Sequence, residues 1–257
     1  MSLARLALRS KMLYAIRDWF RERDFIEVET PVHVAAPAPE VHIDAFRSED
    51  GFLRASPELY LKRLMAQGAQ RLFEIGPCFR RGERGALHNP EYTMLEWYRA
   101  GADYEDILDD CRDLLRYVAE RVTGSQRLTF QHVSIDLGGH WEHLRVRDAF
   151  KTHAAWDPLV EFDENRFDVD FVEKVLPNLA GPAPVVFRDY PVECAALSRC
   201  VQASPPYAER WELLVAGVEL ANAYTELCDA AEQRRRFEDW NQHRAAMGRE
   251  VYPIDEA

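Results

Sequence analysis

The stretch FRRGERGALHNPEYTMLEWY, residues 79–98, combines arginines, carboxylates and aromatic rings around a polar segment that contains two glycines. Runs rich in apolar and aromatic residues flank that segment, RLFEIGPCFR at 71–80 and YTMLEWYR at 92–99. Two such runs joined by a polar loop predict a pair of antiparallel strands. Helical patterns combined with mainly antiparallel strands predict an α+β fold, organised as one domain over residues 1–257.

Working outward, we expect four helices, three of them from the pattern of apolar and charged residues. Those three are the segment from Leu8 to about Asp24, the segment from Tyr104 to Val122, and DAAEQRRRFEDWNQHRAAM at 229–247. The fourth is ELYLKRLMAQG at 58–68. Its start and stop residues predict it, with Ser56 as the N-cap, Pro57 in the first turn and Gly68 as the stop.

Short strands are predicted at FIEVETP (25–31), which Pro31 stops, at GFLRAS (51–56) and at PVVF (184–187). Residues 35–50 are rich in proline and polar groups and predict a surface loop. Residues 123–184 alternate short helical patterns with turns.

The segment RWELLVAGVELANAYTEL, residues 210–227, predicts a hairpin that turns at Ala216 and Gly217. In that register Val215 pairs with Val218 and Leu214 with Glu219, so Glu212 lies diagonally beside Glu219. A divalent cation with oxygen ligands would stabilise this pair of carboxylates, and a well-solvated surface would also tolerate it.

Three further polar residues of this hairpin, Asn222, Tyr224 and Glu226, alternate along the strand and share one face. In a regular strand that face is not the one that carries Glu219. A β-bulge near Leu220 and Ala221 would bring both sets of residues to the same face.

Composition excludes several classes of protein. The chain has a formal net charge of −12, which argues against a general electrostatic attraction to nucleic-acid phosphates. The five cysteines form no C-x-x-C pair, which favours free thiols. No apolar run approaches membrane-spanning length, and basic residues interrupt the N-terminal segment, so we expect a cytoplasmic protein without a membrane partner.

Two local patterns suggest ligand binding. Arg80 ends an apolar strand, where its guanidinium could hold a carboxylate or phosphate, although a surface arginine at a strand end would look the same. Glu96 and Tyr98 lie two residues apart on the following strand and therefore share a face. A carboxylate beside a phenol can hold an ammonium group.

Three blocks in this order resemble the catalytic domain of class II lysyl-tRNA synthetases and their short relatives, the elongation factor P lysine ligases. The blocks are SPELYLKRL (56–64), FRRGERGALHNPEYTMLEWY and ERWELLVAGVELANAYTEL (209–227). The resemblance implies the class II synthetase fold, an antiparallel sheet flanked by helices. FIEVETP resembles motif 1, the dimer-interface strand, which implies a homodimer, and FRRGERGALHNPEYT resembles motif 2.

The resemblance also implies roles for individual residues. Arg80 matches the motif 2 arginine that contacts the amino-acid carboxylate and the α-phosphate of ATP. The nucleotide site is implied to include Arg80, Glu83, His88, Asn89, Tyr92, Glu212 and Glu219, with Tyr92 stacking on adenine. The lysine pocket is implied to be lined by Glu58, Arg80, Glu96, Tyr98, Asn222, Tyr224 and Glu226. Glu212 and Glu219 match the pair that holds Mg²⁺ between the ATP phosphates.

The implied reaction is attack of the amino-acid carboxylate on the α-phosphorus of ATP, which gives an aminoacyl adenylate that is then transferred to an acceptor. The predicted first helix starts within the first ten residues, so we expect no N-terminal anticodon-binding domain. The resemblance therefore favours a lysine of elongation factor P as acceptor, with lysine or (R)-β-lysine as donor. A tRNA-charging fragment is the alternative.

The family's motif 3, a glycine-rich segment whose arginine binds the γ-phosphate, would follow YPIDEA, where the sequence ends at Ala257. A catalytic domain that lacks motif 3 is therefore expected. This expectation adds a third alternative, a non-catalytic paralogue that binds the amino acid.

Overall fold

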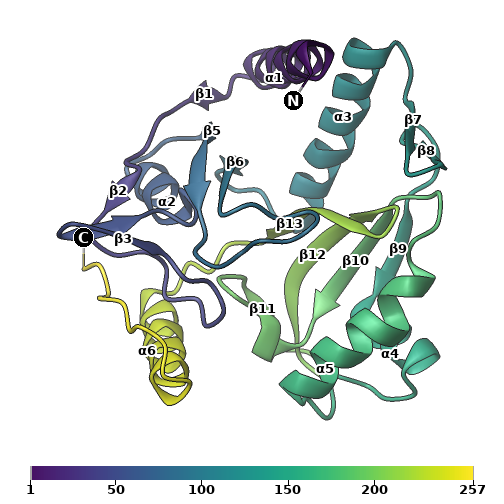
Figure 1. Ribbon diagram of the computed structural model, residues 1–257. Coiled ribbons are helices and arrows are strands. Elements are labelled where there is room, and N and C mark those ends of the chain that lie inside the picture. Colours follow the sequence, from purple (N-terminus) through teal and green to yellow (C-terminus); the bar gives the residue numbers. More distant parts are fainter. Residues whose placement is uncertain (1, 257) are drawn as a thin grey trace. The chain divides into compact units, whose positions relative to one another are not determined.

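The structure is a computed structural model that describes residues 2–256, and Figure 1 shows its helices and strands. The helices are α1 (Leu3–Arg21), α2 (Glu58–Ala66), α3 (Tyr104–Thr123), α4 (Val146–His153), α5 (Glu164–Asp170) and α6 (Ala230–Ala246), with short π and 3₁₀ turns at Phe171–Val175, Leu176–Asn178 and Val192–Cys194. The strands are β1 (Ile26–Glu27), β2 (His33–Val34), β3 (Phe46–Ser48), β4 (Gly51–Leu53), β5 (Arg71–Phe79), β6 (Glu91–Arg99), β7 (Arg127–Phe130), β8 (Val133–Asp136), β9 (Glu142–Arg145), β10 (Val185–Tyr190), β11 (Cys200–Val201), β12 (Tyr207–Val215) and β13 (Val218–Tyr224).

The chain packs into two compact units, which are described here one at a time. Unit 1 combines the chain up to Trp19 with Ala102–Cys228, and unit 2 combines Phe20–Gly101 with the chain from Asp229 onward. The expectation of one catalytic domain over residues 1–257 stays a prediction.

Unit 2 contains the stretch with which the sequence analysis began. β5 and β6 pair antiparallel along their whole length, as predicted, and Glu74 lies opposite Glu96. β1 joins the other side of β5 in parallel, so a strand is present in the segment 25–31, although it covers only Ile26–Glu27 and ends well before Pro31. The sheet is anchored by aromatic packing, since the ring of Phe20 stacks on that of Phe73 with 4.4 Å between centroids.

Helix α2 begins at Glu58 with Pro57 in the N-cap position, one residue later than the predicted N-cap Ser56. The Ser56 hydroxyl accepts a hydrogen bond from the Glu58 N–H at 3.0 Å, which satisfies one of the free donors at the helix start. Gly68 follows the helix with a φ of +104°, a conformation that glycine adopts at little cost. The preceding strand is shorter than predicted, because β4 ends at Leu53. The predicted loop at 35–50 also contains a short strand, β3.

Unit 1 is built on a five-stranded sheet in the order β11-β12-β10-β9, with β13 paired to β12. Val185, Phe187 and Leu214 pack into a core with α4 and α5 on one face. On the other face the Trp211 indole donates to the Tyr104 carbonyl at the start of α3. Figure 1 shows α4 and α5 together beside β9 and β10.

Helix α3 confirms the predicted acidic start. The Asp103 carboxylate caps the N–H groups of Glu105 and Asp106, and the Asp106 carboxylate accepts from the Asp103 N–H, which completes a capping box. Gly124 ends the helix in a left-handed conformation. The region that follows differs from the prediction, because β7 and β8 form a hairpin where short helical patterns were expected.

The β12–β13 hairpin has the predicted register. Ala216 and Gly217 both have positive φ, as a tight two-residue turn requires, and Leu214 lies opposite Glu219. Farther along, Leu213 pairs with Ala221, which leaves Leu220 as an extra residue on β13. The predicted bulge is therefore present.

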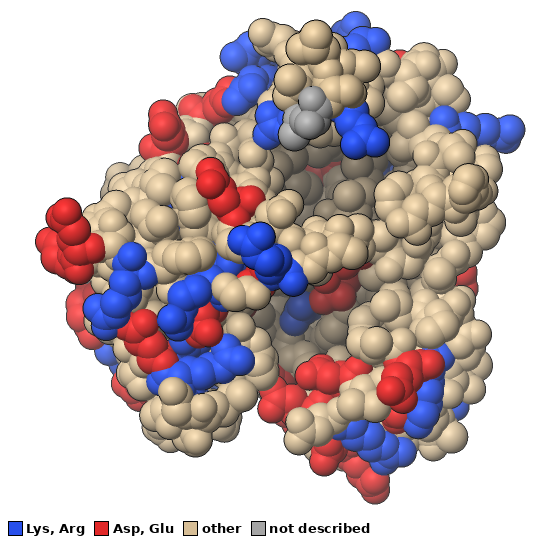
Figure 2. Space-filling view, viewed as in Figure 1, with Lys and Arg blue, Asp and Glu red and all other residues tan. Residues whose placement is uncertain are grey.

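No helix within residues 2–256 is both long and apolar enough to cross a membrane. All five cysteine thiols are free. Acidic and basic side chains lie next to one another over much of the face drawn in Figure 2. The predicted α+β fold, with mainly antiparallel strands, is confirmed.

Candidate active site

In unit 2, a carboxylate on β6 lies at the centre of a polar cluster. Glu96 accepts a hydrogen bond from the Ser56 hydroxyl to Oε1 at 2.5 Å and one from the Tyr98 hydroxyl to Oε2 at 3.2 Å. Glu58 stands at the first position of α2, and its Oε1 lies 2.6 Å from the Lys62 Nζ. The face shared by Glu96 and Tyr98 is thus as predicted.

The acidity of Glu96 reflects these surroundings. Burial, and after it the neighbouring Glu58 carboxylate, raises the pKa of Glu96 to about 8, while the hydrogen bonds from Ser56 and Tyr98 and the charge of Lys62 oppose the shift. In the protein without a bound cation, the Glu96 carboxyl group is therefore mostly protonated at neutral pH. A ligand ammonium beside it would reverse the shift, because a nearby positive charge favours the carboxylate.

This raised pKa gives a test of the cluster that needs no ligand. Between pH 4.5, the ordinary pKa of a glutamate, and about 8, folded Glu96 keeps a proton that the unfolded chain has lost. The free energy of unfolding therefore falls as pH rises through this range. The glutamine in Glu96→Gln is neutral at every pH. At pH 9 we expect the free energy of unfolding of this variant to exceed that of the wild type by about 1–3 kcal/mol, the usual cost of a poorly compensated buried polar group. Near pH 4.5 the two free energies should be equal.

Urea unfolding at several pH values measures this difference. Glu238→Gln, an exposed glutamate on α6, is the control and should keep the wild-type pH slope. An unchanged slope in Glu96→Gln would show that Glu96 titrates normally.

The motif 2 arginine lies where the sequence places it, immediately after β5. The Arg80 N–H donates to the Pro90 carbonyl at 2.8 Å, which continues the pairing of the two strands. Its guanidinium lies 5.5 Å from the centre of the Tyr92 ring, and its Nη1 is 3.8 Å from the Glu83 carboxylate. The Arg80 Nε is buried and has no hydrogen-bond partner within residues 2–256, which suits a group that awaits a ligand.

Tyr92 belongs to the same array. Its hydroxyl donates to the Ala55 carbonyl at 3.1 Å, and burial raises its pKa well above the usual value for a phenol. His88 and Asn89 are exposed in the loop between β5 and β6. Unit 2 therefore brings together Glu58, Arg80, Glu83, Tyr92, Glu96 and Tyr98, with His88 and Asn89 on the adjoining loop.

Unit 1 holds the other predicted residues. Because of the bulge at Leu220, Glu212 lies opposite Asn222 and Leu214 opposite Glu219, so all of these share one face of the hairpin. Tyr224 lies opposite Arg210 at the end of β13. Glu226 follows the strand and forms an isolated bridge with Ser198.

Sequence reasoning missed Arg210, which organises this face. Its Nη2 donates to Glu212 Oε1 at 2.7 Å, its Nε donates to Asn222 Oδ1 at 3.0 Å, and its Nη1 donates to the Cys194 carbonyl at 2.7 Å. The spacing could have revealed it, because residues 210 and 212 share a strand face. Lys62 was missed as well, although it lies four residues after Glu58 on a helix, the usual spacing of an ion pair.

The Glu212 and Glu219 side chains offer carboxylate oxygens, which are the ligands that Mg²⁺ prefers. Glu212 is nearly buried, and the Arg210 guanidinium fixes its Oε1. Glu219 is exposed on the same face. The two carboxylates therefore share one face, and residues 2–256 contain no group of three or more His, Cys, Asp or Glu side chains that could hold a metal ion by themselves.

Comparison with known proteins identifies the family of this chain. The family model of class II tRNA synthetases (D, K and N) matches residues 2–251, and the chain belongs to this family. It is therefore related to enzymes that ligate amino acids.

Two kinds of relative are similar to the chain. The elongation factor P–(R)-β-lysine ligase of Vibrio cholerae is 35% identical over 270 residues, which span 99% of this chain and 83% of the relative. The corresponding ligase of Proteus mirabilis is 36% identical and is covered to the same extent. The lysine–tRNA ligase of Latilactobacillus sakei is 34% identical over 99% of this chain, but over only 55% of its own length.

Proposed function

We propose that this chain activates lysine or (R)-β-lysine with ATP and ligates it to a lysine of elongation factor P. The observation that carries the proposal is the likeness to elongation factor P–(R)-β-lysine ligases over 99% of this chain and 83% of theirs. The acidic cluster around Glu96 supports it, since buried carboxylates beside a phenol are suited to an amino acid with a second ammonium group.

In this reaction the amino-acid carboxylate attacks the α-phosphorus of ATP, the bond to the bridging oxygen of pyrophosphate breaks, and an acyl adenylate remains. Arg80 would neutralise charge that develops at the α-phosphate. Its guanidinium suits this role because it can donate two parallel hydrogen bonds and its Nε has no hydrogen-bond partner within residues 2–256. Tyr92 would offer its ring to adenine, with Glu83, His88 and Asn89 as further nucleotide contacts. Glu212 and Glu219 would hold Mg²⁺, which neutralises phosphate charge.

The amino acid would be positioned by the carboxylates of the polar cluster around Glu96. Glu58 and Glu96 would pair with its ammonium groups, Tyr98 would orient Glu96, and Asn222, Tyr224 and Glu226 would contribute further contacts. Transfer then joins the acyl carbon to an acceptor amine and releases AMP. Most of the rate enhancement would come from positioning and charge neutralisation.

The test begins with ATP–pyrophosphate exchange by the purified chain, measured with lysine and with (R)-β-lysine in turn. Exchange that depends on either amino acid is expected. Labelled amino acid should then appear on purified elongation factor P and not on its lysine-to-arginine variants. Binding of the amino acid without exchange would instead identify a non-catalytic protein.

A second candidate function, charging of tRNA, is supported by the likeness to lysine–tRNA ligases. The labelling experiment described above, repeated with a lysine tRNA transcript as acceptor, distinguishes the two candidate functions. Label that reaches a lysine tRNA transcript and never elongation factor P would overturn the first proposal and establish the second.

We also propose that the protein is a homodimer that uses helix α1. Three large side chains of this helix are exposed to an unusual extent: Leu3 is 84% exposed, Leu8 53% and Tyr14 67%. Sedimentation velocity should give twice the chain mass, and a monomer at micromolar concentration would contradict the proposal.

A further inference from the structure

A buried arginine on α6 binds a loop of unit 2 from several directions. The Arg244 side chain is fully buried, and its Nη2 lies 2.7 Å from Asp44 Oδ1. Its Nη1 donates to the carbonyls of Glu40 at 2.7 Å and Ile43 at 2.9 Å, and its Nε donates to the Glu250 carbonyl at 2.6 Å. The guanidinium therefore fixes the backbone of residues 40–44.

Asp44 connects the same arginine to motif 2. Its backbone carbonyl accepts from the Arg81 N–H at 2.6 Å, and its Oδ2 lies 3.8 Å from the Arg81 guanidinium. A third arginine, Arg249, lies 3.4 Å from Oδ2. Arg81 directly follows Arg80, so Asp44 holds the chain at the point where the motif 2 loop begins.

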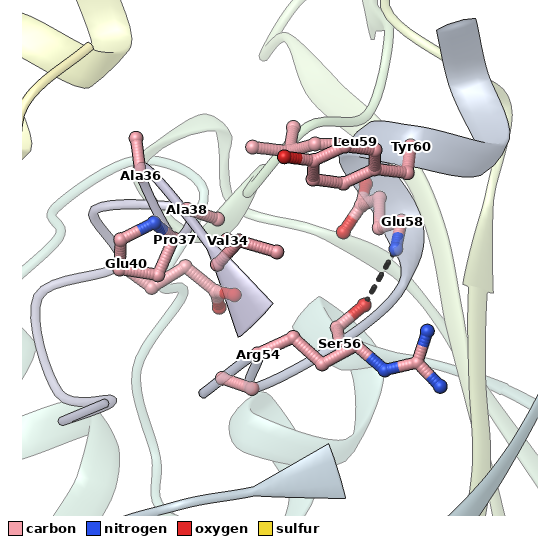
Figure 3. A pocket seen from close by; sticks show the side chains of 11 residues that line it. Val34, Ala36, Pro37, Ala38, Glu40, Arg54, Ser56, Glu58, Leu59 and Tyr60 are labelled. Carbon is pink, nitrogen blue, oxygen red and sulfur yellow. Dashed lines mark hydrogen bonds between the residues drawn. The ribbon is translucent and has the colours of Figure 1, made fainter. Parts of the chain in front are cut away.

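The segment that contacts Arg244 begins at Glu40, and Glu40 also lines one wall of a pocket. The pocket is a small hollow, partly open to solvent, lined by side chains from residues 34–40 and residues 54–60. Figure 3 shows Val34, Pro37 and Glu40 on one side and Ser56 and Glu58 on the other. The side chain of Glu58 extends from α2 toward the loop in this view.

From these contacts we propose that Asp44 and Arg244 are positioning residues that hold the pocket wall and the base of the motif 2 loop in a fixed arrangement, and thereby set the affinity for the amino acid. The inference rests on the proposed function. Its physical basis is that a buried guanidinium needs its partners, so the wall cannot shift without leaving a buried charge poorly compensated. If the pocket wall is already ordered before binding, no binding free energy is lost in ordering it.

Asp44→Asn tests this directly. The variant keeps the backbone carbonyl that binds Arg81 and loses the charge that pairs with Arg244. We expect the calorimetric Kd for lysine or (R)-β-lysine to rise about tenfold, as for a modest misplacement of binding groups, while kcat changes less than threefold. Asp44→Glu restores the carboxylate and should recover at least half of the lost affinity on a logarithmic scale.

Hydrogen exchange supplies a readout that does not depend on activity. In Asp44→Asn, amides of residues 34–44 and 81–89 should exchange faster than in the wild type, with the rest of unit 2 unchanged. Asp239→Asn is the matched control, because it removes an ion pair to Arg235 on the exposed side of α6. Wild-type affinity in Asp44→Asn, or faster exchange throughout unit 2, would overturn the proposal.

Failure of the proposed function gives a different result. If the wild-type chain binds neither amino acid, that function is lost, and faster exchange confined to residues 34–44 and 81–89 still supports the positioning role. Unchanged exchange there would overturn it.

Discussion

Arg80→Lys is expected to lower kcat/KM for ATP–pyrophosphate exchange by about 10²–10³, the typical loss when one group that stabilises developing charge is removed. Lysine keeps the positive charge but presents a single point of contact, whereas the Arg80 guanidinium can hold two oxygens at once. The fold should persist, because the nearest carboxylate, Glu83, is 3.8 Å away and contributes little.

Arg235→Lys is the control for this variant. Arg235 lies on α6 and is 60% exposed, so the same exchange of side chains should leave activity unchanged. Thermal unfolding of both variants should match that of the wild type. Activity of Arg80→Lys within threefold of the wild type would remove Arg80 from the chemistry.

The second large effect is expected at the hairpin carboxylates. Glu219→Gln and Glu212→Gln should each lower exchange activity at least about 100-fold and raise the Mg²⁺ concentration needed for half-maximal activity, since a metal ion supplies several kcal/mol of charge stabilisation. Measuring exchange across a Mg²⁺ titration separates the two quantities. A variant with wild-type Mg²⁺ dependence would exclude its residue as a ligand.

The two variants should differ in stability, and this difference acts as an internal control. Glu219 is exposed, so Glu219→Gln should change the free energy of unfolding by less than about 0.5 kcal/mol. Glu212 pairs with Arg210 at 2.7 Å in a nearly buried setting, so Glu212→Gln should cost about 1–3 kcal/mol. Equal stability of the two variants would contradict the described environment of Glu212.

Much of the fold could be predicted from patterns of residues close together in the sequence. Strands β5 and β6 were predictable because apolar and aromatic runs flank a polar loop, and α3 was predictable from its acidic start and its apolar spacing. The hairpin of β12 and β13 followed from the demand of a tight turn for positive φ at Ala216 and Gly217. Each of these elements depends on interactions close in sequence.

Three strand pairings escaped prediction. The β7–β8 hairpin lies in a segment whose turns resembled breaks between helices, and β9 becomes a strand by pairing in parallel with β10, some forty residues later in the chain. Strand β3 exists because β4 pairs with it across a short loop. Of these pairings, only the one between β9 and β10 joins residues distant in the sequence.

The candidate site shows the same division. Glu96 and Tyr98 were placed on a common face by strand alternation, and the hydrogen bond between them agrees with that placement. The Arg244 contacts with residues 40–44 could not be foreseen, because about two hundred positions separate the partners along the chain. The resemblance to a known family supplied individual roles that spacing alone left open.

The extra residue at Leu220 has a consequence for comparing this chain with others. On β13, the odd-numbered residues before Leu220 and the even-numbered residues after it lie on the same face of the hairpin. An alignment gap of one residue at Leu220 would therefore assign Asn222 and Tyr224 to the opposite face. Any homologue that lacks this insertion would present a different set of polar groups beside its paired glutamates. A change of one residue in the length of the hairpin at Leu220 would therefore change which polar side chains lie on the face of Glu212 and Glu219.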